Sequence, residues 1–189
     1  MQPLELYIHI PFCVKKCAYC DFLSGPAGEK EKEEYVKMLV DEIRNCPDTV
    51  QNYRVISIFF GGGTPSLLTG EQIGRLMDTV REIFTLDEDA EITMEMNPGT
   101  VTEEKLRKYR QAGVNRLSIG LQSVNDEELR LLGRIHTYEE FREAYHLARA
   151  NGFSNINVDL ISAIPGQTVE SWRRTLEQVM ALSPEHISA

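Results

Sequence analysis

Stretches in which apolar and polar residues alternate recur along this chain, and each is followed by a stretch with helical periodicity. Residues 91–97 read Glu-Ile-Thr-Met-Glu-Met-Asn, and a similar alternation recurs in residues 116–123 and 155–161. Strands buried on both faces of a doubly wound sheet would be apolar throughout. A sheet with one polar face can instead curl, so that helices cover its apolar outside and polar groups line a lumen. The sequence therefore predicts an α/β fold built as a partial barrel.

The expected elements follow one another as strand and helix without a linker, repeat or low-complexity run, so we expect residues 1–189 to form one domain. Strands are expected at residues 4–10, 54–60, 91–97, 116–123 and 155–161, with a sixth that begins at 186–189 and is cut short. Helices are expected at residues 30–45, 69–84, 100–113, 126–132, 137–151 and 169–182. Two helix starts have capping-box spacing, Thr100 with Glu103 and Thr137 with Glu140.

Three cysteines, Cys13, Cys17 and Cys20, lie close together directly after the first expected strand. A loop this short can direct three thiolates at one centre, and thiolates are soft ligands that select iron–sulfur clusters, zinc or Cu(I). Three thiolates on a four-iron cluster would leave one iron open to a ligand from outside the protein. The neighbouring positive charges of Lys15 and Lys16 would favour the thiolate forms.

Other interpretations of these cysteines remain open. A structural zinc site needs four protein ligands and could recruit His9 as the fourth. The cysteines could also pack as small apolar residues, or form a disulfide plus a spare thiol in an oxidising compartment. The remaining cysteine, Cys46, follows an expected helix, and we interpret it as a packing residue.

Composition narrows the partners and the compartment. The formal net charge is −9, and an acidic chain without a basic run argues against nucleic acid as the main partner. No apolar stretch approaches the roughly 20 residues that a membrane-spanning helix needs. The N-terminus leads directly into a strand pattern, which predicts no signal peptide. We expect a protein of the reducing cytoplasm.

The cysteine loop resembles that of the radical S-adenosylmethionine superfamily, whose signature is C-x-x-x-C-x-x-C with an aromatic residue before the last cysteine. Cys13, Cys17, Tyr19 and Cys20 match this signature. The preceding string Tyr-Ile-His-Ile-Pro-Phe-Cys at residues 7–13 is similar to the branch that holds oxygen-independent coproporphyrinogen III oxidase and the related heme chaperone. The resemblance covers the whole chain and implies a (β/α)6 partial barrel that continues beyond this portion. It also implies a [4Fe–4S] cluster whose open iron is chelated by S-adenosylmethionine.

Polar and glycine residues stand where several expected strands end, which is where such barrels form their sites. The glycine-rich turn of residues 61–64 follows the second strand, and glycines there let a ligand approach the backbone. It is not a phosphate-binding P-loop, because no Lys-Ser/Thr follows. Glu95, Gln122 and Asp159 lie at similar places on the next three strands.

The resemblance assigns contacts to these positions, and the glycine turn is similar to the family's GGGTP motif, which contacts the methionyl group. The residues matching contacts to the cluster-bound S-adenosylmethionine are Tyr7, Gly62 and Glu95. The residues matching contacts to a second molecule in the oxidase are Gly63, Thr64, Gln122, Arg134 and Asp159. Arg134 is matched through the string Leu-Gly-Arg, and the neighbouring His136 receives no role.

The resemblance leaves two functions in competition. In a radical enzyme, one electron cleaves S-adenosylmethionine and a 5′-deoxyadenosyl radical abstracts hydrogen, which in the oxidase leads to decarboxylation of two propionates of coproporphyrinogen III. A heme chaperone instead binds heme as cargo and passes it to an acceptor protein. The oxidase has a further cysteine two positions after the third cluster cysteine, where this chain has Phe22. The oxidase also carries a long N-terminal extension, whereas only six residues precede Tyr7 here. Both departures favour the chaperone.

Overall fold

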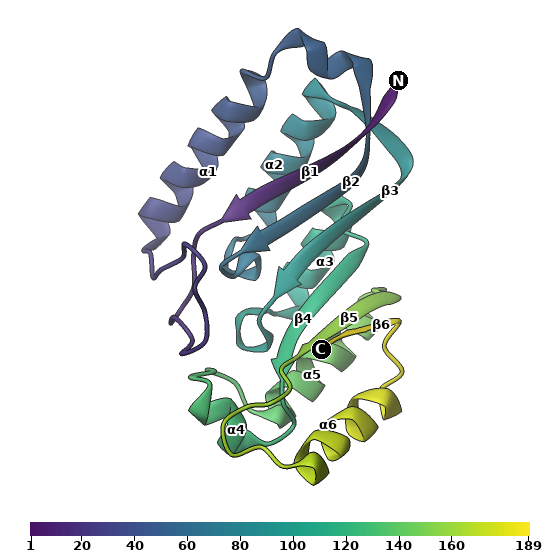
Figure 1. Ribbon diagram of the computed structural model, residues 1–189. Coiled ribbons are helices and arrows are strands. Elements are labelled where there is room, and N and C mark those ends of the chain that lie inside the picture. The colour runs from purple at the N-terminus through teal and green to yellow at the C-terminus, as the bar shows by residue number, and fades with distance from the viewer.

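The computed structural model describes residues 1–189 and contains one parallel sheet whose six strands follow chain order from β1 to β6. The strands are β1 (Gln2–Ile10), β2 (Tyr53–Gly62), β3 (Thr85–Met96), β4 (Arg116–Gln122), β5 (Asn155–Leu160) and β6 (His186–Ser188). The helices are α1 (Glu29–Arg44), α2 (Gly70–Ile83), α3 (Glu103–Ala112), α4 (Asp126–Leu131), α5 (Tyr138–Ala150) and α6 (Val169–Ala181). The predicted partial (β/α)6 barrel is confirmed (Figure 1).

The two faces of the sheet differ as the alternation predicts. Ile58, Phe60, Met94 and Ile119 are fully or almost fully buried, and they belong to one continuous hydrophobic core. Figure 1 shows the larger helices on one side of the curved sheet, with the other side open toward the viewer. Polar residues can therefore occupy the open face without being trapped in the core.

Side chains on the helices and after α1 extend this core. On α5, Phe141 and Tyr145 are buried and Tyr138 packs against the core. Trp172 and Cys46 are partly buried and pack against the same cluster. The interpretation of Cys46 as a packing residue is therefore confirmed, and the aromatic side chains contribute to the same core.

One helix start differs from the prediction. Thr137 and Glu140 form the expected capping box, but the N-cap of α3 is Thr102, whose side chain accepts from the Lys105 amide. Thr100 lies in the short 3-10 turn before it and donates its hydroxyl to the carbonyl oxygen of Asn97, 2.8 Å away. The capping box proposed at Thr100 was wrong because a local turn uses that hydroxyl.

The strand β3 also begins earlier than predicted. Thr85 pairs with Arg54 and Leu86 with Val55, after which the register shifts until Glu91 pairs with Ser57. The acidic residues between the two paired segments hid the first of them, because Asp is depleted in strands. Arg54 offsets part of that charge by pairing with Asp87 at 3.4 Å.

None of the helices combines the length and the apolar character that crossing a membrane requires.

Candidate functional site

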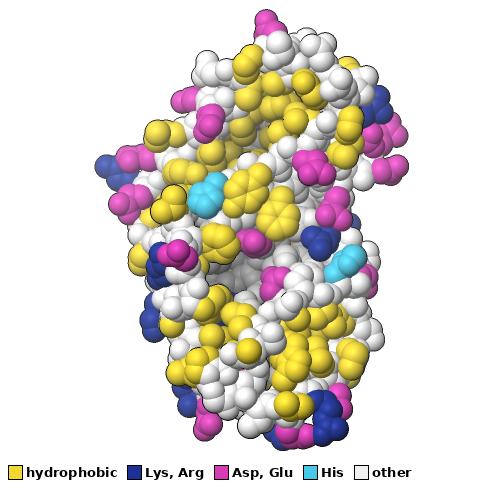
Figure 2. Space-filling model, in the orientation of Figure 1, with side chains coloured by type: hydrophobic (Ala, Val, Ile, Leu, Met, Phe, Trp, Pro, Cys, Tyr) yellow, Lys and Arg dark blue, Asp and Glu magenta, His cyan; other side chains and the backbone are white.

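A cavity of about 270 Å³ lies at the carboxyl ends of the strands, and Figure 2 shows the open face hollowed near its middle, with acidic side chains beside the hollow. The cavity brings together all but one of the predicted site residues. Those that line it are Cys13, Cys17, Tyr19, Cys20, Gly62, Gly63, Thr64, Glu95, Gln122, Arg134 and Asp159. The exception is Tyr7, which lies on β1 outside the lining with its ring stacked against Phe59.

The cysteine loop leaves β1 and is closed at its base by two backbone hydrogen bonds. The Cys13 amide donates to the Gly25 carbonyl, and the Gly25 amide donates to the Pro11 carbonyl, each over 3.0 Å. Cys13 is buried, Cys17 and Cys20 are half-buried, and all three thiols are free. The loop therefore presents three unpaired soft ligands to one cavity.

The residues present fit a four-iron cluster, because three free thiols line one cavity. In a four-iron cluster each thiolate binds a different iron, so the sulfurs stand further apart than the ligands of one ion. His9, the fourth ligand of the zinc alternative, has its ring nitrogens within hydrogen-bond distance of Tyr7 and Leu23 instead. This geometry does not favour zinc.

The glycine turn packs directly on the start of the cysteine loop. The Gly63 amide donates to the Ile10 carbonyl over 2.8 Å, and the Thr64 amide donates to the Phe12 carbonyl over 2.6 Å. A side chain at Gly63 would collide with the Phe12 carbonyl oxygen. Gly62 has a φ of 113°, in the region that favours glycine. The turn therefore packs on the start of the loop, and this close packing requires glycine at these positions.

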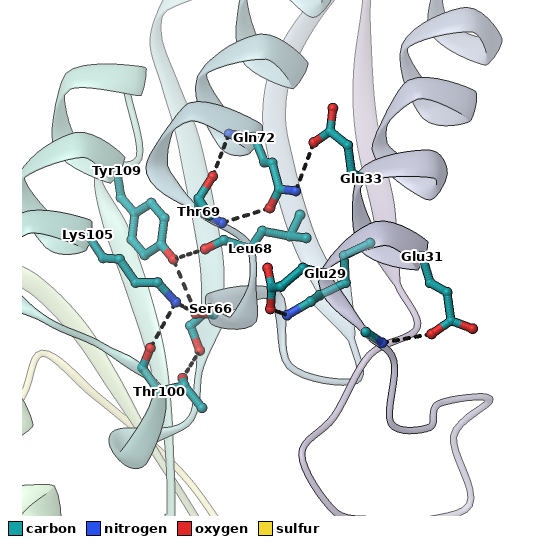
Figure 3. Close-up of polar contacts among 12 residues, drawn as sticks. Glu29, Glu31, Glu33, Ser66, Leu68, Thr69, Gln72, Thr100, Lys105 and Tyr109 are labelled. Atoms are coloured by element: carbon teal, nitrogen blue, oxygen red, sulfur yellow. Dashed lines mark hydrogen bonds and ion pairs between the residues drawn. The ribbon is translucent and has the colours of Figure 1, made fainter.

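A buried polar network holds the far side of this turn, as Figure 3 shows. Lys105 donates to the carbonyls of Ser66 and Thr100, and Tyr109 donates to the carbonyl of Leu68 over 2.6 Å. The hydroxyl groups of Ser66 and Thr100 lie 2.6 Å apart. Burial lowers the pKa of Lys105 and raises the pKa of Tyr109. Helix α3 thus fixes the turn that follows β2.

Two carboxyl groups face the cavity. Glu95 accepts a hydrogen bond from the Gly62 amide over 3.0 Å, and burial, with the nearby charge of Asp159, raises the pKa of Glu95 to about 7. Asp159 accepts from the Ser118 hydroxyl and from the side-chain amide of Asn157, and burial raises the pKa of Asp159 as well. Both groups would be stabilised by a cation, so the cavity favours a ligand that carries positive charge.

The strand β4 is irregular where it reaches the cavity. Gln122 is buried and has a φ of 77°, which is uncommon for a residue other than glycine, and the pairing with β5 shifts register between Gly120 and Gln122. Gly120 and Ser118 also line the cavity but were not singled out from the sequence. A glycine inside a strand is a signal for close approach, and it could have identified Gly120.

Arg134 reaches the cysteine loop from the segment after α4. Its Nη2 donates to the Gly120 carbonyl over 2.6 Å, and its Nη1 lies 3.8 Å from Cys17 Sγ and 3.4 Å from the Tyr19 hydroxyl. Burial raises the pKa of Tyr19 to about 12, so its hydroxyl remains protonated.

His136, which follows Arg134 by two residues, is buried and neutral, because burial lowers its pKa to about 4.

Comparison with known proteins identifies relatives of the whole chain. Residues 7–179 match the sequence model of the Radical SAM superfamily. The chain is 47% identical to the heme chaperone HemW of Escherichia coli, covering 100% of this chain and 50% of that protein. It is 39% identical to the oxygen-independent coproporphyrinogen III oxidase of Salmonella typhimurium, covering 99% and 41%.

The solved structure of the coproporphyrinogen III oxidase HemN from Escherichia coli, described as a Radical SAM enzyme, has a similar fold. The TM-score is 0.89 at 37% identity, over 100% of this chain and 44% of the oxidase. The chain therefore spans half or less of the length of these relatives.

Proposed function

Because the chain belongs to the Radical SAM superfamily, we propose that Cys13, Cys17 and Cys20 hold a [4Fe–4S] cluster and that S-adenosylmethionine binds beside it in the cavity. Membership of the superfamily implies both the cluster and S-adenosylmethionine. The observation that carries the proposal is that three free thiols, a glycine turn and two carboxyl groups line one cavity. No other cysteine is available nearby, because Cys46 packs against the core at the end of α1.

The residues around the cysteines would bind S-adenosylmethionine through complementary charge and shape. Its sulfonium and ammonium groups are cationic, and the carboxyl groups of Glu95 and Asp159 favour such a ligand. We propose that Glu95, Gly62 and Tyr7 contact a cluster-bound molecule. Tyr7 does not line the cavity, so its side chain would have to reach the bound molecule from β1, where its ring stacks on Phe59. We also propose contacts to a second molecule from Gly63, Thr64, Gln122, Arg134 and Asp159, which line the same cavity.

We further propose that the protein acts as a heme chaperone, which binds heme and transfers it to an acceptor protein. The identity to HemW, 47%, exceeds that to the oxidase, 39%. Phe22, which replaces the further cysteine of the oxidase, lines the cavity and is 64% exposed. An exposed aromatic side chain beside the cysteines suits an apolar cargo better than another metal ligand would.

The alternative is an oxygen-independent coproporphyrinogen III oxidase, supported by the likeness to the HemN structure. In that case a bound cluster, reduced by an electron donor, would supply one electron to S-adenosylmethionine. This chain's own residues would orient the ligand: Glu95 would hold a cationic group while the Gly62 amide holds the carboxylate of Glu95 in place.

A direct test uses anaerobically reconstituted protein. We expect the full-length protein to bind heme, and we expect protoporphyrinogen not to form when coproporphyrinogen III, reductant and S-adenosylmethionine are supplied. Absorbance titration measures heme binding, and mass spectrometry measures the product. Formation of protoporphyrinogen would favour the oxidase, whereas protein without acid-labile sulfide would overturn the cluster itself.

A further inference from the structure

The segment Leu132–Arg134, far from the cysteines in sequence, packs against the middle of the cysteine loop. The Ala18 amide donates to the Leu132 carbonyl over 2.9 Å. Gly133 has a φ of 75°, and a Cβ added there would lie 3.4 Å from the Ala18 nitrogen and 3.7 Å from Cys17 Cα. This close backbone packing holds Arg134 beside Cys17.

The guanidinium of Arg134 bridges the barrel and the cysteine loop. Nη2 donates to the Gly120 carbonyl on β4, while Nη1 lies within hydrogen-bond distance of Cys17 Sγ and the Tyr19 hydroxyl. Among the charged side chains, Arg134 is the one within hydrogen-bond distance of a cysteine thiol in this loop, and the Tyr19 hydroxyl also interacts with Cys17. The neighbouring Lys16 instead donates to the Phe22 carbonyl. Because a guanidinium is always charged, Arg134 places a fixed positive charge at one proposed cluster ligand.

We propose that Arg134 is a positioning residue that raises the reduction potential of the cluster through Cys17. The inference rests on the proposed function, because it requires a cluster on these cysteines. A reduced cluster carries one more negative charge than its oxidised form. A positive charge and a hydrogen bond at a ligand sulfur therefore favour reduction, and both are known determinants of cluster potential. Arg134 also lines the cavity, so contact with a bound molecule is compatible with this role.

The test is a redox titration of the anaerobically reconstituted protein, followed by electron paramagnetic resonance in the absence of S-adenosylmethionine. Leaving that ligand out separates an effect on the cluster from an effect on ligand binding. In Arg134→Gln we expect the reduced-to-oxidised ratio at a given potential to fall about tenfold, which is about 59 mV for a one-electron couple. Arg134→Lys should shift less, because it keeps the charge but loses the planar fork.

Two further variants sharpen the result. Arg130→Gln removes an equal charge from the exposed surface of α4 and should leave the potential unchanged. Gly120→Ala keeps the charge but crowds the guanidinium, because its Cβ would lie 3.2 Å from Nη2 of Arg134 and 3.0 Å from Nε2 of Gln122. It should lower the potential by less than Arg134→Gln does. Iron and sulfide content should stay at the wild-type level in all variants.

An unchanged potential in Arg134→Gln with full iron and sulfide would overturn the role of Arg134. Loss of the cluster from all the Arg134 and Gly120 variants, with Arg130→Gln intact, would overturn the tuning role in favour of a purely structural one. Wild-type protein without a cluster would instead overturn the proposed function. The failures are therefore distinguishable.

Discussion

The cysteine loop and the glycine turn meet in one cavity, but they are held in opposite ways. Ser66 and Leu68, just beyond the glycine turn, are fully buried, and α3 fixes their backbone carbonyls through Lys105 and Tyr109. On the cysteine loop, Val14 and Phe22 are 53% and 64% exposed. Backbone hydrogen bonds hold the loop at its base and at Ala18 in its middle, and Arg134 adds side-chain contacts to Cys17 and Tyr19. We infer that the turn supplies a rigid edge, whereas the loop takes its final shape from the group that its thiolates bind.

The largest expected effect is loss of the cluster when a cysteine of the loop is removed. We expect Cys13→Ala, Cys17→Ala and Cys20→Ala each to lose most of the iron and sulfide, because each thiolate would bind a different iron. Cys46→Ala is the matched control and should keep wild-type content, since this thiol packs against the core. Iron and acid-labile sulfide analysis after reconstitution measures the effect. A variant of the three that kept a full cluster would show that its thiol is not a ligand.

The glycine turn should fail through its backbone. In Gly63→Ala the new methyl group would collide with the Phe12 carbonyl oxygen, so we expect a loss of about 1–3 kcal/mol in the free energy of unfolding. Gly74→Ala is the matched control, because a Cβ there meets nothing within 4 Å and lies inside α2. It should stabilise by roughly 0.5–1 kcal/mol.

Urea unfolding of both glycine variants, without cluster, gives the two values. Equal stability of Gly63→Ala and wild type would mean that the turn can move away from the cysteine loop.

Local patterns predicted much of this arrangement. The alternation in residues 91–97 predicted which side chains of β3 face the core, because strand side chains have a period of two. The spacing of the cysteines predicted a shared loop, because only a few residues separate them. Each of the two patterns is local, since its own residues lie within a short stretch of sequence.

What the sequence could not predict depends on tertiary packing. The contact between Arg134 and Cys17 depends on how Leu132 meets Ala18, which no local pattern records. Thr100 had the spacing of a cap, yet the turn at Asn97 uses its hydroxyl. The position of Tyr7 outside the cavity likewise depends on how its ring stacks on Phe59.

The raised pKa of Glu95, which accepts from the Gly62 amide, predicts that ligand affinity depends on pH. The ordinary pKa of Glu95, 4.5, rises to about 7 in the folded protein. A cationic ligand requires the ionised form, so S-adenosylmethionine affinity should rise about tenfold between pH 6 and pH 8. The same shift makes the free energy of unfolding fall as pH rises from 4.5 to 7, because the folded state then binds more protons.

Calorimetric titration of the reconstituted protein across this pH range measures the affinity. Glu95→Gln is the control, since it retains any titration of the ligand itself but removes that of the carboxyl. If both proteins follow the same pH profile, Glu95 does not pair with the ligand.

The smallest expected effect tests whether the support behind the glycine turn is what makes it rigid. Tyr109→Phe removes the hydroxyl that donates to the Leu68 carbonyl, and Lys105→Met removes the ammonium that donates to Ser66 and Thr100. Each should cost about 1 kcal/mol in the free energy of unfolding, the net contribution of a typical hydrogen bond. Lys108→Met, on the same helix, should cost less, because it removes only ion pairs with the exposed Glu71 and Glu104 and keeps the apolar stem that packs on Gly70.

Hydrogen exchange separates a local effect from a global one. If α3 holds the turn rigid, the amides of Gly63 and Thr64 should exchange faster in Tyr109→Phe and Lys105→Met than the loss of stability alone explains. The amides of Cys13 and Gly25 at the base of the cysteine loop should follow the global stability only, because they bond within the loop's own base. Equal acceleration of both pairs would mean that turn and loop open together. The rigid edge and the adaptable loop would then be one cooperative unit, and the contrast between them would be wrong.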